Sequence, residues 1–262
     1  MSAWEVRELP ELTEESLQAL LNNEIGCITV PDFLDPEHRE AAFAPLMKAQ
    51  DWSFYGSDGG EESTVGRLGM TQYEHHEAKD AYFEAAPAAN ARRSEIFGSV
   101  KDPVDVVIDA FDAAWPGGAG LAEEEGQPYF AGVFRRSGGD GIAIHADWGP
   151  RDGPGWAIGE ISGQFAWNFF FSSPQTGGGE LIVYDAPWEP KMEESATWRF
   201  YDYDRELFKD SRKVEVAPEP GILMVFNSKN AHAVAASPDG EGRVAVGSFI
   251  GVTPDGDLGF WS

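Results

Sequence analysis

The sequence has only one cysteine, Cys27, among its 262 residues. A single cysteine cannot build a disulfide framework or a cysteine-based zinc or iron–sulfur site, and it fits a reducing compartment. No stretch approaches the roughly 18 apolar residues that a membrane-spanning helix needs. The acidic N-terminal segment also lacks the apolar region of a signal peptide. We therefore expect a cytoplasmic protein without a membrane partner.

Basic residues are scarce as well: 19 Lys and Arg stand against 45 Asp and Glu, which gives a formal net charge of −26. This charge repels nucleic acid and anionic membranes, so we expect no nucleic-acid partner. A solvated acidic surface is the simpler interpretation of the charge, and steering of a cationic substrate is the alternative. The sequence contains no P-loop, GxSxG, HExxH or dinucleotide-binding glycine motif, which excludes the enzyme classes that depend on them.

The hydrophobic pattern changes after residue 127. Residues 1–127 are predicted to be mainly helical, with a short helix after Thr13 and typical helix starts at Asp35-Pro36 and Asp102-Pro103. Cys27-Ile28-Thr29-Val30 is predicted to be a short strand, and residues 116–127 are interpreted as a loop from their composition. From residue 128 onward, eight short apolar runs alternate with Gly-, Pro- and Ser-rich turns. Such regular short strands predict a closed or double-sheet β architecture such as a jelly roll. We expect one domain over residues 1–262, mainly β with flanking helices, in which 1–127 supports a jelly-roll core formed by 128–262.

His145 and Asp147 end the second of these predicted strands. Residues i and i+2 of a strand share one face, so both side chains can point into the same cavity. His232 lies on a later strand that a barrel would bring alongside. Two imidazoles and one carboxylate form the facial triad of non-haem iron(II) sites, which leaves positions open for dioxygen and a co-substrate. A second match, His75-His76-Glu77, lies in a polar stretch and is interpreted as a solvated helix start.

Arg243 opens the strand that follows His232. A planar guanidinium on an inward strand face is suited to bidentate binding of a carboxylate. A dicarboxylate bound to a metal through its keto-acid end would present its far carboxylate there.

Residues 128–250 resemble the iron(II)/2-oxoglutarate-dependent oxygenase superfamily, particularly its prolyl-hydroxylase-like branch. The resemblance rests on four segments in the expected order: FRRSGGDGIAIHAD, GGGELIVYD, EPGILMVF and NAHAVAASPDGEGRVAVGSFI. It implies a double-stranded β-helix, the jelly roll of the cupin-like folds. It also implies iron(II) bound by His145, Asp147 and His232, with 2-oxoglutarate bound by Arg243 and dioxygen as the second co-substrate.

One position departs from that superfamily. The arginine is usually followed two residues later by Ser or Thr, whereas this chain has Ala245. A second contact to the far carboxylate of the co-substrate must therefore come from elsewhere. Tyr129 and Asn168 are the candidates, and by strand parity Asn168 shares a face with inward residues.

The segments AGVFRRSGG, AWNFFF and GGELIVYDAPW are also similar to a bacterial subgroup that acts on free amino acids and indole alkaloids. Some members of this subgroup are halogenases, which carry Gly or Ala where this chain carries Asp147. The resemblance therefore implies a hydroxylase, or a related desaturase or cyclase, and not a halogenase.

Apolar and aromatic residues flank the predicted metal ligands: Ile142, Trp148 and Phe170. An apolar pocket wall favours a small-molecule substrate with an apolar or aromatic natural-product scaffold. A hydroxylase of free amino acids is the alternative in the same family, and a 2-oxoglutarate-independent metal cupin or a non-catalytic ligand-binding jelly roll are the alternatives outside it. Four aromatic residues of the N-terminal part are candidates for a lid: Trp52, Phe54, Tyr55 and Tyr73.

Overall fold

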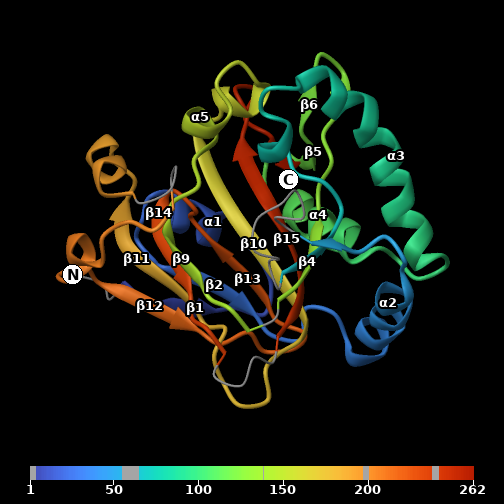
Figure 1. The fold of residues 1–262 in the computed structure, drawn as a ribbon, viewed down its shortest axis with the longest axis horizontal. Helices are drawn as coiled ribbons and strands as arrows, with labels where there is room; N and C mark the ends of the chain where they lie inside the picture. The colour runs from blue at the N-terminus through green and yellow to red at the C-terminus, as the bar shows by residue number, and fades with distance from the viewer. Residues whose placement is uncertain (1–3, 55–64, 138, 197–200, 238–241) are drawn as a thin grey trace.

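Two facing β-sheets form the centre of the computed structural model, which describes residues 4–54, 65–137, 139–196, 201–237 and 242–262. Figure 1 shows the smaller sheet on the left, β10 and β15 in the middle, and α2, α3 and α4 on the right. The strands of the larger sheet lie in the order β1 (Val6–Glu8), β2 (Cys27–Val30), β13 (Leu223–Phe226), β10 (Gly163–Ser172), β15 (Val244–Val252), β8 (Val133–Arg136), β4 (Gly66–Leu68) and β3 (Ser53–Phe54). Two further strands extend it, since β16 (Leu258–Trp261) pairs with β15 and β5 (Ala119–Leu121) pairs with β16.

The smaller sheet has the order β12 (Lys213–Val216), β11 (Leu181–Pro187), β14 (Asn230–Val234) and β9 (Ile142–His145). A separate pair joins β6 (Glu123–Glu124) to β7 (Gln127–Pro128). The eight strands predicted from residue 128 onward correspond to β8 through β15. This arrangement confirms the predicted mainly β fold with flanking helices and a double-stranded β-helix core.

The residues of β10 show how one strand separates two cores. Alternate side chains of a strand point to opposite faces. Phe165, Trp167 and Phe169 pack on the outer face with the helices, whereas Ala166 and Phe170 pack between the two sheets. The outer cluster takes side chains from residues before and after 127.

Three helices begin where the sequence predicts. Thr13, Asp35 and Asp102 accept first-turn backbone N–H groups with their side chains, which satisfies donors that have no partner within the helix. The helices that follow them are α1 (Glu14–Leu21), α2 (Pro36–Lys48) and α4 (Pro103–Ala114).

The first 127 residues, predicted to be mainly helical, also supply strands β1 to β5 to the larger sheet. The strand predicted at Cys27–Val30 is confirmed as β2, whereas the other four were not predicted. The segment 116–127, interpreted as a loop from its glycines, contains β5 and β6. Helix α3 (Lys79–Phe97) is long but was not predicted, since Pro87 lies inside it and its apolar residues show little helical periodicity. The remaining helices are short: η1 (Tyr73–His75), α5 (Gly149–Asp152), η2 (Ala157–Glu160), η3 (Pro190–Ser195) and η4 (Arg205–Phe208).

The candidate lid residues have different surroundings. Trp52 packs against the outer core and donates its indole N–H to the Leu46 carbonyl. Phe54 is 54% exposed, and Tyr73 stacks on His76. Tyr55 lies outside the described residues, so the lid stays a prediction. Across the described ranges, no helix is both long and apolar enough to span a membrane.

Candidate metal centre

Three predicted metal ligands lie together where the smaller sheet faces the barrel interior. Strands β9 and β14 are paired with His145 opposite His232, and Asp147 follows the end of β9. The Asp147 Oδ2 atom is 3.6 Å from His145 Nε2 and 3.3 Å from His232 Nε2. One ligand atom from each residue lies within 4.8 Å of the other two. In the part of the chain that the structure describes, no other set of three such side chains is grouped in this way.

Backbone carbonyls orient both imidazoles. The Nδ1 atom of His145 lies 2.8 Å from the Ala143 carbonyl oxygen, and that of His232 lies 2.9 Å from the Asn230 carbonyl oxygen. A neutral imidazole that donates from Nδ1 keeps a free lone pair on Nε2. Both lone pairs then point toward the space beside the Asp147 carboxylate, which suits a metal ion.

The charges of the three groups agree with this arrangement. Burial alone would raise the pKa of the Asp147 carboxyl, but attraction and hydrogen bonding from His145 and then His232 hold this pKa well below its usual value. Burial, followed by repulsion from His145, lowers the pKa of His232 despite the bond with Asp147. The site therefore offers an anionic oxygen beside a neutral imidazole, which is the donor chemistry of a divalent metal site.

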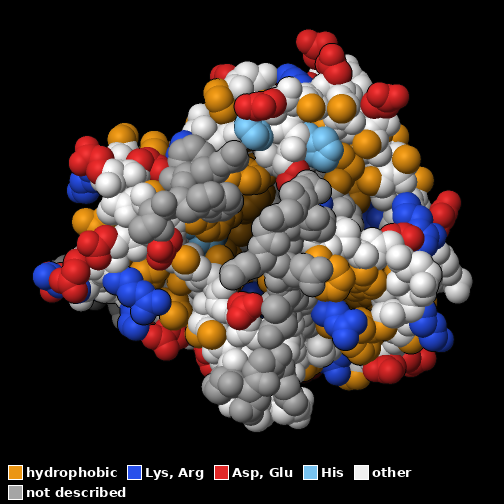
Figure 2. Space-filling view, viewed as in Figure 1, with side chains coloured by type: hydrophobic (Ala, Val, Ile, Leu, Met, Phe, Trp, Pro, Cys, Tyr) orange, Lys and Arg blue, Asp and Glu red, His pale blue; other side chains and the backbone are white. Residues whose placement is uncertain are grey.

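Aromatic rings enclose the two histidines. The ring of Tyr201 stacks on His145, with centroids 4.5 Å apart and planes inclined by 21°. Phe226 meets His232 edge-on at 4.9 Å. Figure 2 shows a hollow near the centre of this face of the molecule, with hydrophobic side chains along its wall. Tyr201 was not singled out from the sequence, because no local pattern connects it to β9.

Arg243 has the surroundings expected of an anion-binding residue. Its guanidinium donates to the Gly179 carbonyl at 3.3 Å, and none of the ion pairs found between described residues includes it. Burial, and then the neighbouring positive charge of Arg135, lowers the pKa of Arg243 to about 10. A bound carboxylate would relieve both effects.

Asn168 and Phe170 point into the barrel, as strand parity predicts. Phe170 lies in the cluster between the sheets, and Asn168 occupies the same face two residues earlier on β10. A Cβ atom at Gly247 would be 2.8 Å from Asn168 Oδ1, so the amide lies directly over that glycine. Gly247 pairs with Asn168 across β10 and β15. The position fits a polar contact to a molecule inside the barrel, and that role stays a prediction.

Three other predicted residues lie elsewhere. The Tyr129 hydroxyl donates to Glu124 at 2.7 Å within a separate aromatic cluster, so it is already bonded away from Arg243. Ile142 shares the strand face of Ile144, which packs on the outside of the smaller sheet, and the opposite parity carries His145 inward. Trp148 lies under the ammonium of Lys229 in a pocket outside the triad. The geometry gives no support to the cofactor or substrate roles predicted for these three.

Comparisons with known proteins identify the family of the chain. The sequence profile described as "Carrier-protein-independent halogenase WelO5" matches residues 5–262. The Leucinostatins biosynthesis cluster protein S of Purpureocillium lilacinum is 33% identical over 198 residues, which cover 72% of this chain and 80% of that protein. The L-gamma-glutamyl-L-propargylglycine hydroxylase of Streptantibioticus cattleyicolor is 33% identical over 184 residues, covering 70% of this chain and 67% of that protein.

The fold is also that of a solved enzyme. A novel N-substituted L-amino acid dioxygenase from Burkholderia ambifaria superposes with a TM-score of 0.64 at 19% identity, covering 95% of this chain and 91% of that one. The match to the family extends over nearly the whole sequence. The chain therefore belongs to the family of the carrier-protein-independent halogenase WelO5 and is an iron(II)/2-oxoglutarate-dependent oxygenase.

Proposed function

We propose that His145, Asp147 and His232 hold the iron(II) ion and that Arg243 holds the far carboxylate of 2-oxoglutarate. The convergence of three ligand atoms within 4.8 Å carries this proposal. Iron(II), 2-oxoglutarate and dioxygen together supply the oxidising chemistry that attacks an unactivated C–H bond. The protein contributes orientation: Nδ1 bonds fix both imidazoles, and Tyr201 and Phe226 shield them from water.

We further propose that the enzyme is a hydroxylase, although its family is described as a halogenase family. Halogenases of the subgroup resembled here carry Gly or Ala at the carboxylate position, which leaves room for chloride. Here the Asp147 Oδ2 atom lies 3.6 Å and 3.3 Å from the two Nε2 atoms, and the histidines hold the pKa of its carboxyl well below its usual value. An anionic oxygen at this position occupies the site that chloride would need and repels it. One of the two relatives is itself described as a hydroxylase.

For the substrate, we propose a small amino-acid derivative that carries a carboxylate, in preference to a purely apolar scaffold. Of the three residues that favoured an apolar pocket, only Phe170 lies in the barrel. The hydroxylase relative and the dioxygenase of similar fold are both named for amino-acid derivatives.

An anaerobic titration tests the cofactor assignment without knowledge of the substrate. Addition of iron(II) and 2-oxoglutarate should produce the weak visible charge-transfer band of the chelate in the parent protein. The band should be absent in His232→Ala and Arg243→Ala. If iron binds tightly and no band forms, the proposed binding of 2-oxoglutarate at this triad and Arg243 is wrong.

Product analysis tests the reaction and the substrate class. Turnover in chloride-containing buffer with N-acyl or γ-glutamyl amino acids should give products that have gained oxygen and show no chlorine isotope pattern. Indole compounds without a carboxylate serve as the matched comparison. A chlorinated product from the parent enzyme would refute the hydroxylase assignment, and turnover of the neutral indoles alone would refute the carboxylate requirement.

A further inference from the structure

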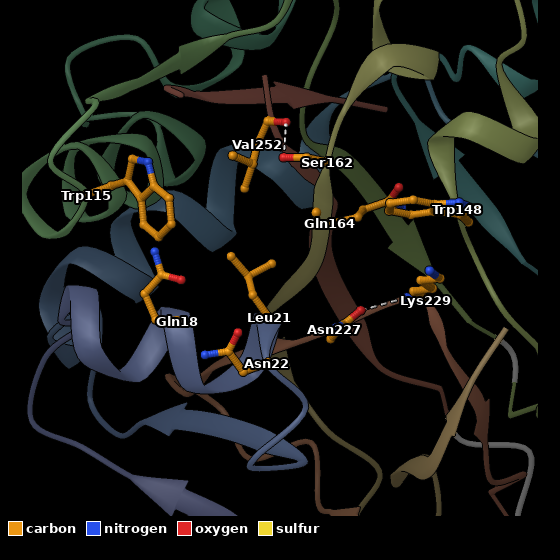
Figure 3. A pocket seen from close by; sticks show the side chains of 11 residues that line it. Gln18, Leu21, Asn22, Trp115, Trp148, Ser162, Gln164, Asn227, Lys229 and Val252 are labelled. Carbon is orange, nitrogen blue, oxygen red and sulfur yellow. Dashed lines mark hydrogen bonds between the residues drawn. The ribbon is translucent and has the colours of Figure 1, made fainter. Parts of the chain in front are cut away.

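A buried glutamine binds the segment that carries the metal-binding carboxylate. Gln164 lies on β10 and is 2% exposed. Its Oε1 accepts the Gly149 N–H at 2.7 Å, and its Nε2 donates to the Asp147 carbonyl at 3.2 Å. One side chain therefore holds the backbone at Asp147 and two residues beyond it. Figure 3 shows Gln164 next to Trp148, with Asn227 and Lys229 nearby, in the pocket outside the triad.

The same amide reaches the segment that leads to the second histidine. Gln164 Nε2 also donates to Ser228 Oγ at 3.0 Å. The Ser228 hydroxyl lies 3.3 Å from the Asp147 carbonyl, and the Ser228 carbonyl accepts the Asp147 N–H at 2.9 Å. Ser228 lies two residues before the strand that carries His232. Gln164 thus connects two chain segments that each supply a ligand.

The other backbone groups of the Asp147 segment are held from a different direction. Arg151 donates to the Ala146 carbonyl at 2.5 Å, and Asp152 accepts the Trp148 N–H at 2.9 Å. These bonds do not involve Gln164. Removal of the Gln164 amide should therefore shift Asp147 without unfolding the segment.

We propose that Gln164 is a positioning residue that fixes Asp147 relative to His232 and so sets the geometry and affinity of the metal site. Its hydrogen bonds go to the Gly149 N–H, the Asp147 carbonyl and the Ser228 hydroxyl, and not to the side chains of the metal ligands. Both ends of its amide are used, which explains why a polar residue lies at a buried, inward position of β10, next to the apolar run that follows it. The proposal rests on the metal assignment made above. Replacement of a group that hydrogen-bonds to a metal ligand typically weakens metal binding by about 10- to 100-fold.

The test uses cobalt(II) as a spectroscopic probe of the metal site in the full-length protein without co-substrate. Gln164→Met keeps the length of the side chain but removes the donor and the acceptor. We expect the dissociation constant for cobalt(II) to rise roughly 10- to 100-fold and the visible d–d spectrum to change. Gln164→Asn, whose amide is one methylene group shorter, should change both in the same direction, and it provides the result if Gln164→Met does not fold.

Asn90→Leu is the matched control. The Asn90 amide on α3 donates to the Tyr129 carbonyl at 3.0 Å, a comparable bond outside the triad. This variant should keep the parent spectrum and cobalt(II) affinity even if its melting temperature falls. If the Gln164 variants bind cobalt(II) as the parent does, or if all three variants lose affinity only in proportion to lost stability, the positioning role is wrong. If the parent itself does not bind cobalt(II), the proposed metal site fails together with this inference.

Discussion

Replacement of Arg243 by Met should separate binding of the co-substrate from stability of the fold. The guanidinium is largely buried and finds no acidic partner among the ion pairs of the described residues. Removal of one partner from a buried, hydrogen-bonded charge pair costs about 2–5 kcal/mol. Because each 1.4 kcal/mol is a factor of ten, the dissociation constant for 2-oxoglutarate should rise roughly 30-fold to roughly 4,000-fold.

The same substitution should not destabilise the ligand-free protein. Burial and the charge of Arg135 lower the pKa of Arg243, which means that the folded state disfavours the charged guanidinium when no carboxylate is bound. Arg243→Met should therefore leave the melting temperature unchanged or raise it. Arg243→Lys keeps the charge but not the planar fork, so it should have an intermediate affinity.

The assay is the anaerobic titration of iron(II)-loaded protein with 2-oxoglutarate, together with thermal unfolding of each variant without ligand. Arg212→Met is the control, since Arg212 is exposed and already pairs with Asp185. Affinity of Arg243→Met within about threefold of the parent value, well below the loss expected for a buried charge pair, would refute the reasoning. So would a fall in melting temperature large enough to explain the lost binding.

Other parts of the molecule give three further predictions. His232→Ala should lose tight iron(II) binding because one of three converging donors is gone, whereas His76→Ala should retain it; metal content after desalting compares the two, and equal content would contradict the assignment. Arg93 is 4% exposed and its ion pairs join α3 to α4, so Arg93→Met should lower the free energy of unfolding by about 3–5 kcal/mol in a urea titration. The exposed Arg92→Met should change it little, and equal midpoints for the two variants would count against this reasoning. Burial raises the pKa of the Cys27 thiol to about 12, above an unfolded value of about 8.5, so the thiol's stabilising contribution declines as pH rises between these values. A thiol reagent at mildly alkaline pH should then label only unfolded protein, and rapid labelling of the folded protein would contradict the burial.

Local rules predicted much of the candidate site. Strand parity placed His145 and Asp147 in one cavity and turned Asn168 and Phe170 inward, and the structure agrees. The same rule, applied to Ile142, would have directed it to the outer face beside Ile144. Adjacency to a ligand in the sequence was the weaker argument, because neighbouring residues on a strand face opposite ways.

The sequence indicated that Gln164 is a buried amide, but it did not indicate which groups Gln164 bonds. It is a polar residue at the inward parity of β10, which indicates a buried amide in need of hydrogen bonds. Its partners, Gly149 and Ser228, lie on segments distant in sequence. No sequence pattern indicated Tyr201, since its contact with His145 depends on how a later segment of the chain pairs with β9.

The sequence by itself determined the periodic features: the alternating faces of β10, the helix starts at Asp35 and Asp102, and the types of ligand available. These depend on the backbone geometry of a few neighbouring residues. Only the tertiary structure decided that His232 lies opposite His145, that the N-terminal strands join the larger sheet, and that Gln164 connects both ligand segments. Pairing between distant strands depends on chain closure and on the complementary shapes of whole faces, and no short window of sequence carries that information.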